Sequence, residues 1–125
     1  MDWQEQYETA ADREQQAYET QPIAQLLEQI KQRQYGSYNM IWSVLAERAT
    51  LSEAGWPLFD VLHRDIDYLI RCNCAEALLQ LLGRTDVMDV LRESVNLTAG
   101  TPTDRGPYIK ALEQELIHTI GKPNP

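Results

Sequence analysis

The stretch from Tyr68 to Leu82 constrains the fold of this 125-residue chain more than any other feature. Its apolar residues follow a helical spacing and cover most of the helix circumference. The one narrow polar strip consists of Asn73, Glu76 and Gln80. A helix that is apolar on nearly every side must be enclosed by neighbouring elements. We therefore predict that this helix forms the centre of the fold.

The rest of the chain also has helical periodicity, with Gly and Pro at most joints and no alternating pattern that would predict a strand. Ser37 is the predicted N-cap of the third helix, Asp65 or Asp67 caps the fifth, and Gly83 ends it. Residues 51–55 and 98–106 are predicted connections. The fold class is all-α, with predicted helices over residues 2–20, 22–34, 38–49, 56–63, 66–82, 86–96 and 107–120.

After the first helix, the predicted helices form three consecutive pairs. Their second members end near residues 49, 82 and 120, a spacing typical of helical-repeat arrays. Each pair has one apolar side that it cannot bury alone, so we expect the pairs to stack as antiparallel hairpins. This gives a hairpin domain over residues 22–121, preceded by an acidic N-terminal helix or cap over 1–21 and followed by a tail over 122–125.

The middle pair resembles a HEAT repeat, whose pattern places a proline in the first helix, an aspartate in the turn and a basic residue early in the second helix. Pro57, Asp65 and Arg71 stand close to that spacing, and small and aliphatic residues follow over 74–83. The resemblance covers roughly a quarter of the chain. It implies a short HEAT-like α-solenoid that acts as a binding scaffold, in which Arg71 pairs with Asp65 of its own or an adjacent unit.

The charge of the chain bears on its partners. The net charge of −8 argues against nucleic acid, because binding to the phosphate backbone relies on clustered Lys and Arg. Residues 1–21 contain six acids and one base, which is −5 of that total. A basic protein partner would fit this charge, although solubility alone could also account for it.

The lack of a membrane span or a signal peptide in the sequence, together with its two cysteines, predicts the cellular compartment of the protein. No stretch approaches the ~20 apolar residues of a membrane span, and no basic start leads into an apolar run, so we expect neither a membrane segment nor a signal peptide. Cys72 and Cys74 diverge around a helix and are expected to be free thiols in the core. Free thiols suit a reducing compartment, so we expect a cytoplasmic protein.

Residue types that carry catalytic or metal chemistry are sparse. His63 and His118 each have a single acid nearby, and Cys72 and Cys74 lack the spacing of a zinc knuckle. Phosphate-binding glycine loops and hydrolase nucleophile motifs are absent from the sequence. We therefore expect no catalytic residue, metal or cofactor.

Two groups of residues are candidates for a partner-binding surface. The polar strip on the central helix could line the concave side of a stacked array, and aromatic residues flank the joints of the first two pairs. For the aromatic residues we favour half-buried packing over an interface, and an ordinary solvated face explains the polar strip at least as well as a binding surface does. The candidate residues are Glu47, Arg48, Asn73, Glu76, Gln80, Trp42 and Trp56.

The function predicted from these features is a non-enzymatic protein–protein interaction module or adaptor. One alternative is an immunity-type inhibitor that blocks a basic partner. Another is a HEAT-like protein that handles a prosthetic group or small ligand. The acidic N-terminal segment is expected to pack as a cap over the first pair, or else to reach out toward a basic partner.

Overall fold

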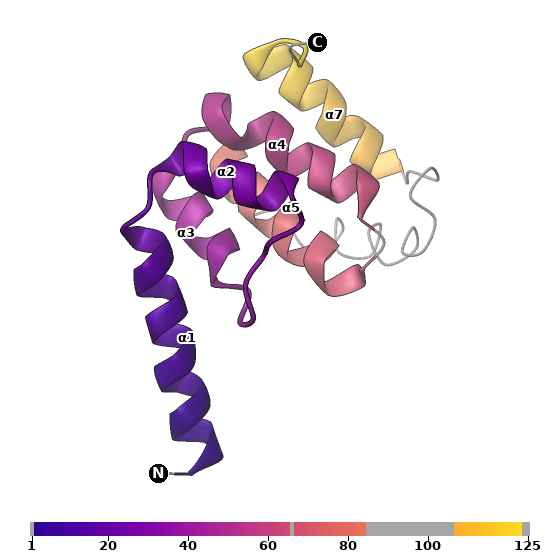
Figure 1. The fold of residues 1–125 in the computed structure, drawn as a ribbon. Coiled ribbons are helices and arrows are strands. Elements are labelled where there is room, and N and C mark those ends of the chain that lie inside the picture. Colours follow the sequence, from indigo (N-terminus) through magenta and orange to yellow (C-terminus); the bar gives the residue numbers. More distant parts are fainter. Residues whose placement is uncertain (1, 66, 85–106, 124–125) are drawn as a thin grey trace.

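The computed structural model describes residues 2–65, 67–84 and 107–123. These residues form helices and contain no strand, so the all-α prediction is confirmed for this part of the chain. The helix predicted over 86–96 and the connection over 98–106 lie outside the described residues. The described helices are α1 (Trp3–Glu19), α2 (Ile23–Lys31), α3 (Met40–Arg48), α4 (Leu51–Arg64), α5 (Tyr68–Leu82) and α7 (Pro107–Ile120) (Figure 1).

Helix α5, the predicted centre, is buried along much of its length, while α4 contacts α2, α5 and α7, and α3 contacts α1, α2 and α5. Helix α5 packs most extensively against α4 and also against α3. Asp67 caps it by accepting the N–H of Ile70 at 3.1 Å, and Gly83 ends it in the left-handed region at φ +71°. The first turn remains open to solvent, with Leu69 55% exposed. The buried residues of α5 are Arg71, Cys72, Cys74, Ala75, Ala77, Leu78 and Leu79.

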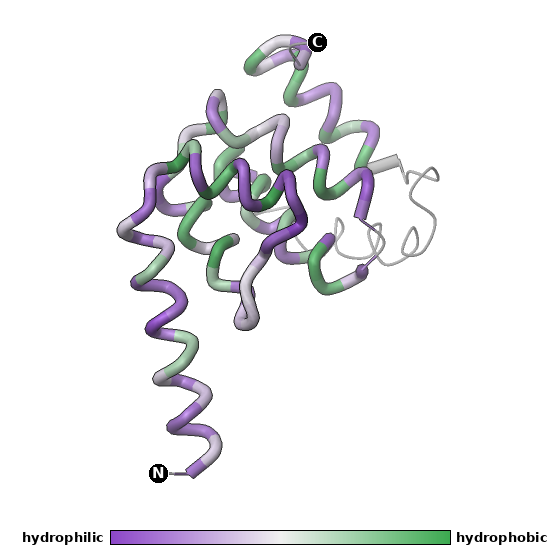
Figure 2. The backbone as a smooth tube through the Cα atoms, viewed as in Figure 1, coloured by the Kyte–Doolittle hydropathy of each residue, from purple (hydrophilic) through white to green (hydrophobic). Residues whose placement is uncertain are grey.

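The other helices pack against one another in a regular set of contacts. Helix α2 packs against α3 and α4, α3 packs against α5, and α7 packs against α4 (Figure 1). Figure 2 shows the apolar segments gathered in the body formed by α2 to α5, whereas α1 is largely hydrophilic. Each aliphatic side chain buried in this body contributes roughly 1.5–3 kcal/mol to folding.

Helix α4 is longer than predicted, because residues 51–55 are helical and not a connection. Thr50 Oγ1 accepts the N–H of Glu53 at 3.2 Å, and Glu53 Oε1 accepts the N–H of Thr50 at 2.9 Å. This reciprocal capping box satisfies two amides at the helix start. The Thr-x-x-Glu pattern was present in the sequence and could have placed the start of α4 at Leu51.

A glycine inside α4 allows close packing against α7. A Cβ atom at Gly55 would meet Ile120 Cδ1 at 2.9 Å and Leu116 Cδ2 at 3.3 Å. Trp56 then ties the same two helices, since its Nε1 donates to the carbonyl of Gly121 at 2.9 Å. Ile109, Leu112 and Leu116 of α7 are buried, and Ile120 packs against the core.

The prediction that Ser37 caps the start of α3 is wrong, because a side chain from α1 caps this helix instead. Asn39 occupies the cap position in a left-handed conformation, without a side-chain cap bond. Glu14 supplies the acceptor instead: its carboxylate accepts the N–H groups of Ser37 at 2.6 Å, Tyr38 at 3.0 Å and Met40 at 3.1 Å. A carboxylate suits the positive end of a helix. Glu14, which lies on the same side of α1 as the buried residues Ala11 and Tyr18, therefore helps to dock this helix.

Helix α1 packs through only part of its length. Ala11 and Tyr18 are buried against the body, but Tyr7 is 50% exposed and Trp3 is 79% exposed. Figure 1 shows the N-terminal turns extending away from the other helices. The C-terminal half therefore covers α3, while the N-terminal half projects.

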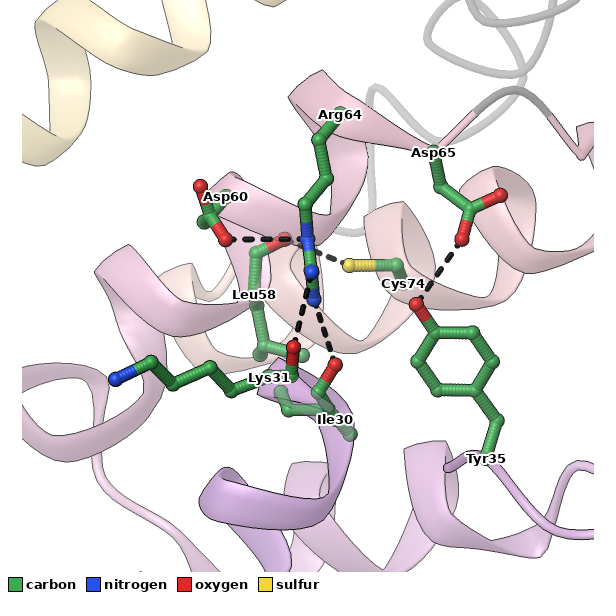
Figure 3. A network of polar contacts seen from close by, with 8 residues as sticks. All are labelled: Ile30, Lys31, Tyr35, Leu58, Asp60, Arg64, Asp65 and Cys74. Atoms are coloured by element: carbon green, nitrogen blue, oxygen red, sulfur yellow. Dashed lines mark hydrogen bonds and ion pairs between the residues drawn. The ribbon is translucent and has the colours of Figure 1, made fainter. Parts of the chain in front are cut away.

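An arginine of α4 caps the end of α2. Arg64 donates from Nη2 to the carbonyl of Ile30 at 2.6 Å and from Nη1 to that of Lys31 at 3.0 Å (Figure 3). Its Nε lies 3.2 Å from a carboxylate oxygen of Asp60, one turn earlier on α4. A cation at the last carbonyls of a helix complements the helix dipole, so this contact holds α2 against α4.

Candidate functional site

A shallow depression of about 150 Å³ lies between α3 and α5. We call it the α3–α5 depression. Ala46 on α3 and Ala77 on α5 contribute only small side chains to it, whereas most of the remaining lining residues carry polar groups. The lining residues are Asn39, Trp42, Ser43, Ala46, Asn73, Glu76, Ala77 and Gln80.

Four of the seven predicted partner-binding residues line this depression. Asn73, Glu76 and Gln80 are spaced three and four residues apart, so α5 presents them on one face, and Trp42 joins them from α3. Side-chain amides offer both donors and acceptors, as a peptide backbone does, and Glu76 adds a negative charge. The depression can therefore hydrogen-bond a main chain and attract a cationic side chain.

Trp42 gives the depression an unusual feature. Its side chain is only 3% exposed, and its ring lies 5.1 Å from that of Tyr35. The indole Nε1 is buried and has no hydrogen-bond partner within the described part of the chain. A buried donor without a partner costs about 1–3 kcal/mol and calls for an explanation. Because this nitrogen is not exposed, an acceptor from a bound partner could reach it only if side chains that line the depression moved aside.

The other three predicted residues lie elsewhere. Glu47 is exposed on α3 and does not line the depression. Arg48 donates from Nη1 to the carbonyls of Tyr18 at 3.1 Å and Gln21 at 3.0 Å, and so caps the end of α1. Trp56 bonds to α7 and packs edge-on against Phe59, with ring centroids 5.7 Å apart. Arg48 and Trp56 therefore hold helices together.

A second hollow, which sequence reasoning missed, lies between α2 and α4. We call this space of about 350 Å³ the α2–α4 groove; its lining is mainly apolar. The periodicity of α2 predicts an apolar face, but it cannot show that the neighbouring helix leaves part of that face uncovered. The residues that line it are Ala24, Leu27, Glu28, Ile30, Lys31, Pro57 and Asp60.

The buried polar groups near α5 serve packing. The hydroxyl of Tyr35 donates to Asp65 at 3.0 Å (Figure 3), and burial together with this hydrogen bond raises the pKa of Tyr35 to about 12. The thiol of Cys74 donates to the carbonyl of Leu58 at 2.8 Å, and burial raises its pKa. A thiol held in its neutral form is a poor nucleophile. The prediction that Cys72 and Cys74 are free and buried is confirmed.

Arg71, which carries part of the HEAT resemblance, is 1% exposed. Its Nε donates to the carbonyl of Leu62 at 3.1 Å. Burial lowers the pKa of Arg71, and the charge of Asp65 acts in the opposite direction. The two predicted partners are thus close enough to interact, while a direct ion pair between them stays a prediction.

The structure offers no group suited to metal binding among the residues that it describes. His63 is half-buried on α4 and His118 is exposed on α7. Within residues 2–65, 67–84 and 107–123, no three His, Cys, Asp or Glu side chains gather closely enough to hold a metal ion. None of the helices in these ranges has the length and apolarity needed to cross a membrane.

Comparison with known proteins adds no family to this description. No protein-family model matches the chain, and neither a curated protein nor a solved structure matches it significantly. The class that the fold defines is that of all-helical proteins.

Proposed function

We propose that this chain is a non-enzymatic protein-interaction module, an adaptor that holds a segment of a protein partner in the α3–α5 depression. One observation carries the proposal: the depression joins the polar strip of α5 to a buried indole whose N–H lacks a partner among the described residues. Amide, hydroxyl and carboxylate groups around an aromatic side chain suit a peptide with a basic residue.

The proposed architecture is a short HEAT-like stack of hairpins. The hairpin of α2 and α3 meets the hairpin of α4 and α5 through two like-placed contacts, α2 with α4 and α3 with α5. These contacts support the proposal, because stacked repeats bury first helices against first helices and second helices against second helices. Pro57, Asp65 and Arg71 then belong to the second unit of the stack.

Site-specific crosslinking tests the proposed function. A photo-crosslinking amino acid would replace Ser43 or Gln80, both exposed residues that line the depression, in the protein expressed in its own cell. We expect the same protein adduct from both positions and none from Gln25, an exposed control on α2. Identical adducts at all three positions, or no adduct at either depression position, would contradict the proposal.

A matched substitution sharpens this test. Trp42→Phe removes the indole N–H but keeps an aromatic ring, so the folded protein loses a buried donor that it does not satisfy internally. Loss of the unsatisfied donor stabilises the variant, while the space left by the smaller ring destabilises it, so the free energy of unfolding should change by less than about 2 kcal/mol. The crosslinking yield at Gln80 should nevertheless fall about five-fold or more. An unchanged yield would show that the partner does not use this N–H.

The α2–α4 groove favours a second candidate function, the handling of a small apolar ligand. Its volume of about 350 Å³ and mainly apolar lining fall within the range of small-molecule sites. Native mass spectrometry of protein purified from its own cell distinguishes the candidates. A bound small molecule that is lost in Ala24→Phe, which narrows the groove, would favour this second function over the adaptor.

A further inference from the structure

The first turns of α1 present an aromatic face beyond the end of the packed body. We define the aromatic face of α1 by Trp3 and Tyr7, which are 79% and 50% exposed. Their spacing of four residues puts them on one side of the helix, the same side as Glu14 and Tyr18, which dock α1 onto the body. The docking stripe therefore runs on for about two helical turns that stay largely exposed, although the ring of Tyr38 contacts Tyr7.

This face is held in a fixed position. Asp2 caps α1 by accepting the N–H of Glu5 at 2.8 Å, so the first turn is helical. The ring of Tyr7 packs edge-on against Tyr38 at a centroid distance of 5.1 Å, which ties the projecting turns to the segment before α3. Aromatic side chains on a helix that is already formed lose less conformational entropy on binding than they would on an unfolded segment, which favours docking at this face.

The negative charge of the first turns of α1 determines which kind of partner this face can bind. Residues 1–12 contain four carboxylates (Asp2, Glu5, Glu8 and Asp12) and no Lys or Arg. Helical spacing places Glu5, Glu8 and Asp12 on the side of α1 opposite Trp3 and Tyr7. The projecting turns are only about one Debye length across, so these charges still act on whatever contacts Trp3. A second copy of this chain would bring the same negative charge and be repelled. An Arg or Lys side chain would be attracted and could also lie on the exposed indole.

From these observations we infer that the aromatic face of α1 binds a basic amphipathic helix of a partner protein, which would extend the packing that α3 begins. This surface is separate from the α3–α5 depression, because it uses different residues. The chain then has two docking surfaces, and the second is governed by charge. Electrostatic attraction of this kind accelerates association and weakens as salt is added.

A defined peptide tests the inference. The probe is a fluorescent peptide of about 21 residues built from Leu and Lys, with the leucines on one helical face. Titration with the full chain should raise its fluorescence anisotropy, and affinity should fall about ten-fold between roughly 0.05 and 0.3 M salt. A peptide in which Glu replaces every Lys should not bind. Failure of the Lys peptide to bind at about 1 mM, or equal binding of the Glu peptide, overturns the inference.

Variants then locate the surface. Trp3→Ala combined with Tyr7→Ala changes two exposed side chains and should weaken peptide binding at least about ten-fold with the helical content retained. Gln16→Ala, on the far side of α1, should leave affinity within about two-fold. Equal affinity of the double variant and the unaltered chain overturns the inference. So does a concentration-dependent dimer, measured by sedimentation, that the double variant abolishes. Crosslinking from Gln80 is unaffected by either result, so this inference and the proposed function fail independently.

Discussion

Tyr35 shows how one side chain can couple the titration of the protein to its folding. Its hydroxyl reaches from the segment between α2 and α3 to Asp65, the residue that ends α4. Burial and this hydrogen bond both favour the neutral phenol and raise its pKa from 10.0 to about 12. The folded chain therefore binds this proton more tightly than the unfolded chain does.

The consequence is a loss of stability at alkaline pH. The contribution of Tyr35 is fully present below pH 10.0 and disappears as the pH rises through about 12. As the pH rises through this range, the free energy of unfolding of Tyr35→Phe should therefore fall by less than that of the unaltered chain. Urea unfolding at several pH values measures this difference. The comparison isolates Tyr35, because Tyr18, whose pKa burial also raises, is present in both proteins. Parallel pH profiles for the two proteins would contradict this assignment.

At the scale of elements, helices in this protein hold one another's ends. Glu14 of α1 caps the start of α3, Arg48 of α3 caps the end of α1, and Arg64 of α4 caps the end of α2. Each contact satisfies backbone groups that a helix cannot satisfy internally, using a charge of the sign that the helix dipole favours. These contacts fix relative positions that apolar packing alone would leave adjustable.

Removal of the Glu14 cap gives the first test at this scale. Glu14→Ala leaves three N–H groups before and within α3 without their acceptor, so we expect a loss of roughly 2–3 kcal/mol in unfolding free energy. Glu14→Gln keeps an acceptor oxygen and should therefore lose less unfolding free energy than Glu14→Ala. Asp12→Ala, an exposed acid on the same helix, is the control and should change stability by under about 0.5 kcal/mol.

The contact between α4 and α7 gives the second test at the scale of elements. Gly55→Ala would gain about 1 kcal/mol of helix propensity on its own, yet the added Cβ meets Ile120 Cδ1 at 2.9 Å. We expect a net loss in melting temperature. Ile120→Val removes the atom that Cβ would meet, so Gly55→Ala should be better tolerated in that background. A thermal-unfolding double-mutant cycle with no coupling between the two positions would contradict the proposed steric conflict.

Sequence periodicity predicted the helices well, because the burial of one helical face depends on spacing within a short window. It predicted the strip of Asn73, Glu76 and Gln80 for the same reason, but not the opposite wall supplied by Asn39 and Ser43. The role of Glu14 was also beyond local reasoning, since its partners lie 23 to 26 residues away. In the local sequence of α1, Glu14 is only a polar residue between apolar ones.

At the scale of the whole molecule, α1 combines two different regions. Its C-terminal half is bound by Glu14, Tyr18 and the acceptors of Arg48, while Trp3 and the first turns make few contacts with the body. The acidic segment 1–21 is therefore not uniform in its attachment. We therefore expect stability to depend on the C-terminal half, whereas the first turns are exposed.

Two truncations test this division. Deletion of residues 2–9 removes exposed turns and should lower the melting temperature by only a few degrees. Deletion of residues 2–21 removes the cap of α3 and both acceptors of Arg48, so we expect a far larger decrease or loss of cooperative unfolding. Equal effects of the two deletions, followed by circular dichroism on heating, would mean that the contacts of Glu14 and Arg48 contribute little.

The position of the two cysteines provides an internal reporter. Both lie on α5, the chain has no others, and Cys74 is fully enclosed with its proton held on sulfur. A thiol reagent can reach Cys74 only when the core opens around it, so its modification follows the opening of the fold. The rate at which a thiol reagent labels Cys74 would therefore measure how often α5 becomes accessible, without any cysteine having to be introduced.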